Sequence, residues 1–190
     1  MNILDTITDK MLRFFFSLKQ DDWIKWTAQD NDWKDDCDKF NGCFFIVKQM
    51  PKYPQHLGCQ CKLKKISKPI PNVSANANLD LRKFTEYVFS NNYNDGKKEL
   101  FEKWGYTIKD SEYLQQLYIE QALEKYCNGN YKLKGAGAFY PKIEIIIELP
   151  TRTGQTQKIK TGWTLYPEGK IKLSTPFTGF ETKGDVYGQI

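Results

Sequence analysis

The chain has 190 residues, 40% of them hydrophobic and 15% aromatic, which is enough to bury a core and excludes wholesale disorder. Its formal net charge of +5 is mildly basic, which permits binding to nucleic acid or to an anionic surface without requiring either. No apolar stretch approaches the roughly 18 residues of a membrane-spanning helix, and the first residues lack the order of a signal peptide. We therefore expect a cytoplasmic protein without membrane contact.

Residues 1–33 show the periodicity of an amphipathic helix. Apolar side chains recur at spacings of three and four residues from Leu4 to Leu18. Trp23 and Trp26 continue the stripe after a short polar break. The pattern predicts an N-terminal helix that packs one face on its neighbour.

Residues 34–61 have a different character, because four of the five cysteines and the only histidine lie there. Asn41-Gly42 is typical of a tight turn, and residues 43–47 after it predict a short strand. Pro51 and Pro54 then end regular structure. Clustered cysteines in a cytosolic chain favour a metal over disulfides.

Five candidate ligands follow from this clustering: Cys37, Cys43, His56, Cys59 and Cys61. Zinc takes four such ligands at tetrahedral positions, so the set has one donor to spare. The spacing of Cys59 and Cys61 is tighter than usual, but residues i and i+2 of a strand share a face. Disulfides and free buried thiols remain alternatives. A zinc ion with four protein ligands would be structural and would staple a small module.

Residues 23–63 also resemble a known family. The resemblance rests on four segments: Trp26-Thr27-Ala28, Asp35-Asp36-Cys37, Asn41-Gly42 and Pro54-Gln55-His56-Leu57-Gly58-Cys59-Gln60-Cys61. Together they resemble the C-terminal end of phage minor head proteins of the Mu F type. The gap between Cys37 and Cys43 is wider than the CxxC spacing usual in that family. The resemblance implies a phage or mobile-element origin, association with a virion as an alternative to the cytoplasm, and phage head or portal proteins as partners.

A lysine-rich and then proline- and asparagine-rich stretch follows over residues 62–78. Such composition rarely packs into a core. We therefore divide the chain into a helical and Cys/His-containing module over residues 1–63, a linker over 64–78 and a second domain over 79–190.

The second domain is predicted to begin with helices and to end in strands. Three amphipathic segments predict helices between residues 79 and 127, with Gly105 at the C-terminal end of the second. Residues 142–149, 157–166 and 170–175 predict strands joined by short turns, which makes an antiparallel meander. Trp163 shares a face with apolar residues and is expected in the core. The predicted fold class is α+β.

Residues 79–180 resemble the small C-terminal domains of bacterial polymorphic toxins. The segments that carry this resemblance are Asn78-Leu79, Gly96-Lys97-Lys98, Phe101, Trp104-Gly105-Tyr106, Lys160-Thr161-Gly162-Trp163 and Leu173-Ser174-Thr175. Helices followed by a meander is also the layout of small toxin ribonucleases related to barnase and RelE. The resemblance implies a toxin-like effector, a metal-independent ribonuclease, with RNA as substrate and a cognate immunity protein as partner.

RNA cleavage here would have to proceed without histidine, because His56 lies in the Cys/His module. Lysine can hold phosphate, stabilise charge or act as a base when its pKa is depressed. The predicted catalytic residues are Lys97, Lys98, Lys160, Thr161 and Thr175, and the predicted nucleic-acid-binding residues are Arg152, Lys158, Lys172 and Tyr140. The alternatives are an ordinary solvated sheet face and a non-enzymatic module that binds nucleic acid or protein, in the virion or outside it.

Overall fold

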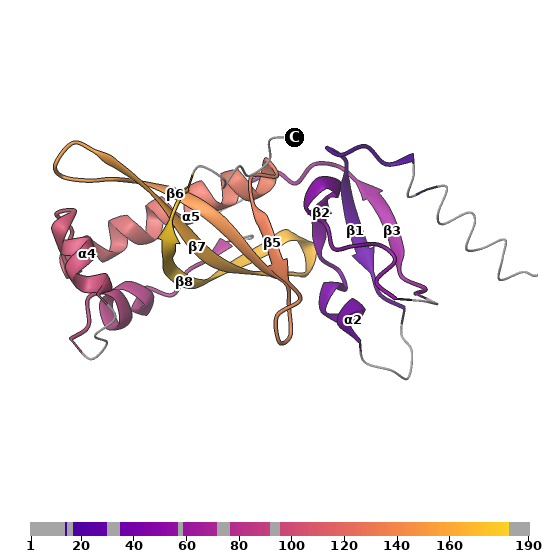
Figure 1. Ribbon diagram of the computed structural model, residues 1–190, viewed down its shortest axis with the longest axis horizontal. Helices are drawn as coiled ribbons and strands as arrows, with labels where there is room; N and C mark the ends of the chain where they lie inside the picture. Colours follow the sequence, from indigo (N-terminus) through magenta and orange to yellow (C-terminus); the bar gives the residue numbers. More distant parts are fainter. Residues whose placement is uncertain are drawn as a thin grey trace, which may run out of the picture.

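The structure is a computed structural model that describes residues 14, 17–29, 35–56, 59–71, 77–91 and 96–182. It confirms the α+β class. Two sheets lie side by side, a three-stranded one of order β2-β1-β3 and a five-stranded one of order β4-β8-β7-β6-β5 (Figure 1). No helix within the described ranges is long and apolar enough to cross a bilayer.

The smaller sheet corrects the helix predicted over residues 1–33. Its central strand is β1 (Trp23–Thr27), which pairs antiparallel with β2 (Phe44–Ile46) and β3 (Lys62–Ile66). Trp23, Ile24 and Trp26 are all buried. A central strand covered on both faces has no alternating pattern, so the spacing of its tryptophans imitated a helical stripe. Most of the remaining predicted helix lies outside the described residues.

Part of the predicted linker is also regular structure. Residues 64–66 belong to the edge strand β3, where exposed lysines are common because they discourage pairing with other chains. β4 (Ala77–Asn78) runs parallel to β8 at the edge of the larger sheet. The strand predicted over residues 43–47 is confirmed as β2 and is followed by the short helix η1 (Val47–Gln49).

The three helices predicted between residues 79 and 127 are confirmed. They are the π-helix η2 (Lys83–Val88), α4 (Lys97–Lys103) and α5 (Ser111–Cys127), with the 3-10 turn η3 (Ile108–Asp110) before the last. Gly105 follows α4 with φ of +88°, the left-handed conformation that glycine adopts at a helix end. The helices pack against one another through aromatic side chains. Phe84 of η2 contacts Tyr118 of α5 edge-on and Phe101 of α4 in a tilted arrangement.

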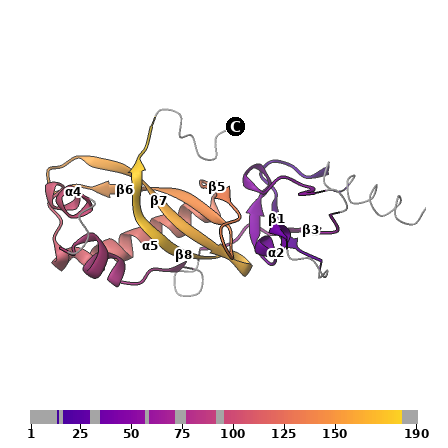
Figure 2. The same ribbon diagram turned by 60° about the horizontal axis from the view of Figure 1, so that its bottom comes forward.

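The meander is confirmed and extended by one strand. Its strands are β5 (Lys132–Gly135), β6 (Lys142–Pro150), β7 (Thr156–Tyr166) and β8 (Lys170–Phe180), with the turn η4 (Pro167–Gly169) between the last two. α5 lies along one face of this sheet (Figures 1 and 2). Ile145, Ile159 and Trp163 point into the core beneath it and are fully buried. The opposite face is called the outer face below.

The two sheets share one continuous core. Tyr126 of α5 donates a hydrogen bond to the carbonyl of Phe44 at 2.9 Å, and Ile46 N donates to Tyr131 Oη at 3.2 Å. Glu168 N, at the turn between β7 and β8, donates to the carbonyl of Gly42 at 2.8 Å. The Cys/His module is therefore anchored on the larger domain by hydrogen bonds that its strand β2 and the turn before it provide.

Candidate metal centre and outer face of the sheet

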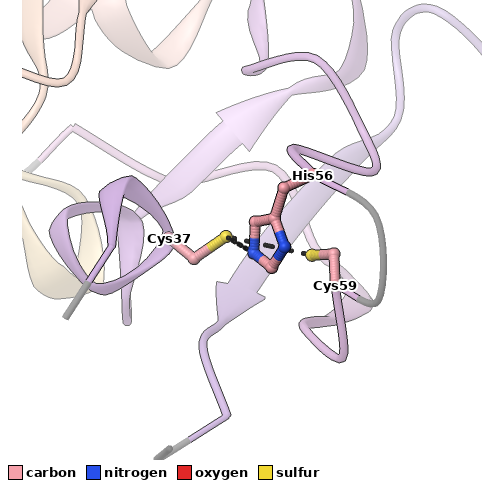
Figure 3. Close-up of side chains that lie close together, drawn as sticks. All are labelled: Cys37, His56 and Cys59. Carbon is pink, nitrogen blue, oxygen red and sulfur yellow. Dashed lines mark hydrogen bonds between the residues drawn. The ribbon is translucent and has the colours of Figure 1, made fainter. Parts of the chain in front are cut away.

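Three of the predicted metal ligands meet in space. Cys37 lies in the short helix α2 (Asp36–Phe40), and His56 and Cys59 come from the irregular segment before β3. Cys37 Sγ lies 3.5 Å from His56 Nε2 and 3.8 Å from Cys59 Sγ (Figure 3). All three ligand atoms lie within 4.8 Å of one another, so this group could hold a metal ion.

The distances match the edges of a zinc tetrahedron. With Zn–S of about 2.3 Å and Zn–N of about 2.0–2.1 Å, tetrahedral angles give S···S edges of about 3.8 Å and S···N edges of about 3.5 Å. The observed separations from Cys37 Sγ are 3.8 Å and 3.5 Å. The three side chains are thus already spaced as ligands of one ion.

Cys61 lies beside this group and is the candidate for a fourth donor. Burial raises the pKa of its thiol, and the thiols of Cys37 and Cys59 are both close enough to interact with it. The indole N–H of Trp26 is buried without a hydrogen-bond partner in the described part of the chain, and Trp26 also acts on the pKa of Cys61, lowering it. A metal-bound thiolate at Cys61 would be an acceptor for that N–H, so the surroundings fit a thiolate.

Asp35 ties the two halves of this group together. Its Oδ1 accepts a hydrogen bond of 2.7 Å from Cys37 N as the N-cap of α2, in a capping box with Asp38. Its Oδ2 lies 2.9 Å from His56 Nε2. One carboxylate therefore caps the helix that carries Cys37 and also contacts the imidazole. It does so at Nε2, the nitrogen that lies 3.5 Å from Cys37 Sγ, so an ion bound at that nitrogen would have to displace Asp35.

Cys43, the fifth predicted ligand, lies elsewhere. It is buried, and its thiol donates to the carbonyl of Leu165 at 3.8 Å, inside the shared core. Burial raises the pKa of Cys43 to about 12 and that of Cys127 to about 11. The structure thus separates Cys43 from the group formed by Cys37, His56 and Cys59.

At pH 8 we expect iodoacetamide to leave Cys43 unmodified in the folded chain. Because the pKa of Cys43 is about 12 instead of the ordinary value of about 9, the thiolate fraction is roughly a thousandfold smaller, and only the thiolate reacts. The contribution of the neutral Cys43 thiol to stability is fully present below about pH 9, the ordinary pKa of a thiol. That contribution is lost as the pH rises toward 12, the pKa of Cys43 in the folded chain. Mass spectrometry of the digested protein measures the labelling, and the urea-unfolded chain is the control. Native labelling of Cys43 at the unfolded rate would contradict the burial.

The outer face of the larger sheet carries several of the predicted nucleic-acid residues. Lys158 and Lys160 alternate on β7 with buried residues, and Lys158 pairs with Glu181 at 3.5 Å. Lys172 of β8 is exposed and lies opposite Thr164. Tyr140 packs against Tyr166 with 4.5 Å between ring centroids. Thr175 faces Gly162 across the sheet, where the absent side chain leaves room beside it.

Other predicted site residues are placed away from this face. Lys97 lies over the ring of Tyr87, and Lys98 bonds Asn91 and pairs with Glu102, all around α4. Arg152 pairs with Asp110 at the turn between β6 and β7. The structure does not bring these three cations together with Lys160.

Thr161 has a structural role. It is fully buried on the core side, where its hydroxyl donates to the carbonyl of Ile145 and accepts from Trp163 Nε1, both at 2.7 Å. Trp163 lies in the core as the sequence predicts. Thr161 therefore points to the face of the sheet opposite to that of Lys160.

A polar cluster that the sequence reasoning missed lies on the outer face. Lys142 Nζ donates to Thr164 Oγ1 at 2.5 Å and to Ser174 Oγ at 3.3 Å, and the two hydroxyls are 2.7 Å apart. Lys83 Nζ, from η2, donates to the carbonyl of Ser174 at 2.9 Å. Strand alternation in the sequence could have placed Thr164 on this face, but no local signal joins residues this far apart in the chain.

Comparison with known protein families gives a match over the larger domain. The model of a family described as a domain of unknown function, DUF6883, matches residues 69–179, more than half of the chain. No curated protein and no solved structure matches. The polar cluster of Lys83, Lys142, Thr164 and Ser174 falls inside the matched region, whereas the Cys/His group lies before it.

Proposed function

Since the chain belongs to the DUF6883 family of domains of unknown function, we propose its activity from the site itself: the domain is a toxin-like effector that cleaves RNA without a metal ion. One observation carries the proposal. The outer face of the sheet combines lysines, hydroxyls and a packed tyrosine pair, Tyr140 with Tyr166. Lysines that track a phosphate backbone beside rings that stack on bases are typical of single-strand binding.

The chemistry needs three groups. The 2′-hydroxyl of RNA must lose a proton, the leaving oxygen must gain one, and the negative charge on phosphorus must be stabilised. Burial and the nearby charge of Lys83 lower the pKa of Lys142, which favours an amine able to accept a proton. Lys160 and Lys172 on the same face supply positive charge, and Lys160 donates the proton that the leaving oxygen gains. This set replaces the histidine that the domain lacks.

Expression of the full chain in bacteria tests the proposal. We expect growth arrest with loss of cellular RNA, and cleavage of RNA by the purified chain to 2′,3′-cyclic phosphate and 5′-hydroxyl ends. Lys160→Ala should reduce cleavage at least tenfold, since it removes a cation from the face, which is worth about 1.4 kcal/mol or more in the transition state. Lys109→Ala, an exposed lysine outside the sheet, is the matched control. Intact RNA together with normal growth would refute a nuclease.

A non-enzymatic module is the second candidate. The absence of histidine from the domain favours it, because histidine is the usual acid and base at neutral pH. In that case the same face binds nucleic acid or a protein without cleaving it. Binding of RNA by the purified chain with no cleavage products would establish this alternative.

For the Cys/His module we propose a structural zinc ion held by Cys37, His56, Cys59 and Cys61. The tetrahedral edge distances and the orphaned indole N–H of Trp26 support it. Four protein ligands leave no position for substrate, so the ion would stabilise the module and take no part in catalysis.

The origin and partners follow from the resemblances. We propose that the Cys/His module derives from the C-terminal end of a Mu F-type phage minor head protein and that the effector domain is fused to it. The protein would act in the virion or in the cytoplasm. Phage head or portal proteins and a cognate immunity protein are the proposed partners. Relief of the growth arrest by a co-expressed neighbouring gene would support an immunity protein.

A further inference from the structure

Two lysines converge on one serine at the edge of the outer face. Lys142 Nζ lies 3.3 Å from Ser174 Oγ, and Lys83 Nζ lies 2.9 Å from the carbonyl oxygen of the same residue. The two lysines come from different elements, the first residue of β6 and the first residue of η2. Thr164, which is buried, completes the group by bonding both Lys142 and Ser174.

Neither cation is paired with a carboxylate in the part of the chain that the structure describes. Other lysines at the sheet are paired, such as Lys134 with Glu144 and Lys158 with Glu181. Glu144, the buried acid of the outer face, lies 3.5 Å from Lys134. Lys83 repels the charged form of Lys142 and, after burial, is a cause of its lowered pKa. Asp80 and Glu86 line the same pocket as Lys83, but no ion pair joins either of them to it.

The strand geometry that builds the cluster is irregular. β7 and β8 slip out of register on both sides of Gly162, so that Gly162 faces Thr175 and Trp163 faces Leu173. Ser174 is the extra residue between these pairs. A β-bulge of this kind re-aims a side chain and is over-represented beside functional sites. The bulge turns Ser174 toward Thr164 and Lys142, at 2.7 Å and 3.3 Å.

We infer that Lys83, Lys142, Thr164 and Ser174 form a binding site for one phosphodiester group of single-stranded RNA. Two lysine amino groups and two hydroxyls are donors of the kind that phosphate oxygens accept from, and neither lysine is held in an ion pair by a described carboxylate. Tyr140, just before β6, and Tyr166, at the end of β7, lie two residues from Lys142 and Thr164 in the chain, where a neighbouring base can stack on a ring. The inference rests on the proposed function for RNA as the source of the phosphate.

Binding of a fluorescent, fully 2′-O-methylated RNA oligonucleotide to the full-length chain tests this site. The modified strand has no free 2′-hydroxyl and cannot be cleaved by that route, so binding is measured apart from catalysis. Lys142→Gln removes the charge but can still bond Thr164, and Lys83→Gln removes the second charge. We expect each to weaken binding about tenfold and to reduce the slope of log K against log salt by about 0.7, the share of one phosphate contact.

The controls separate this site from the nuclease. Lys142→Arg should keep the affinity within about twofold, since it keeps the charge. Lys109→Ala should bind as the wild type does. If both glutamine variants keep the wild-type affinity and salt slope, the binding site is wrong, although the domain could still cleave RNA. A wild-type protein that cleaves RNA but does not bind the modified strand would also overturn the binding site. Binding lost in the glutamine variants, in a chain that cleaves no RNA, would confirm the site and refute the nuclease.

Discussion

Replacing Cys59 by serine is expected to remove zinc from the protein and to unfold the module around α2. A neutral hydroxyl is a poor substitute for a thiolate at zinc, and the three remaining ligands cannot close the tetrahedron. Binding energy at a structural site is folding energy, so we expect a loss on the order of 3 kcal/mol or more. The zinc content should fall from one ion per chain to none.

Metal analysis and tryptophan fluorescence measure this together. Trp26 is fully buried and packs edge-on against Phe40 and Tyr53 beside the site, so its emission reports the unfolding of the module. Cys43→Ala is the matched control, because Cys43 lies in the core against Leu165 and should leave one zinc bound. Zinc retained in the Cys59→Ser protein, or lost in the Cys43→Ala protein, would show that the ligand set is different.

Thr161→Val is expected to destabilise the larger domain by about 2–4 kcal/mol. Valine has nearly the same shape but no hydroxyl, so the carbonyl of Ile145 and the indole N–H of Trp163 would lose their partner inside the core. Each buried group left unpaired costs about 1–3 kcal/mol. Urea unfolding followed by tryptophan fluorescence measures the change.

Cleavage by the Thr161→Val protein separates this role from catalysis, because valine removes the hydroxyl. If Thr161 is structural, the valine and wild-type proteins should cleave RNA at the same rate under conditions where both are folded. Thr161→Ser, which keeps the hydroxyl and loses one methyl group at a cost of about 1 kcal/mol, is the control for stability. Unchanged stability in Thr161→Val would mean that the two hydrogen bonds contribute nothing to the fold.

The helices and the meander of the larger domain were predictable because each signal is local. The apolar spacing of α5, the glycine after α4 and the alternation of β7 all act within a few residues. β1 was predicted wrongly for the converse reason. Trp23 is buried against Tyr126, and Trp26 is buried against Phe40 and Tyr53. Packing between segments this far apart in the chain leaves no mark in a short stretch of sequence.

The metal ligands show the same division. The sequence by itself determined that cysteines and a histidine cluster within residues 37–61, because zinc ligands must be close and the chain is short there. Only the tertiary structure decided which ones meet. Cys43, just before β2, lies in the core against Leu165, whereas α2 and the segment before β3 bring Cys37, His56 and Cys59 together.

The outer face was determined in part. Sequence alternation put lysines on the side of β7 away from Trp163, and the structure keeps them there. The cluster on that face depends on three things that no local pattern encodes: a bulge at Ser174, the approach of η2 to the sheet, and the pairing of β6 with β7 that sets Lys142 opposite Thr164. Composition and periodicity therefore settled the fold class and the polar character of the surface, whereas long-range strand pairing decided which charges meet.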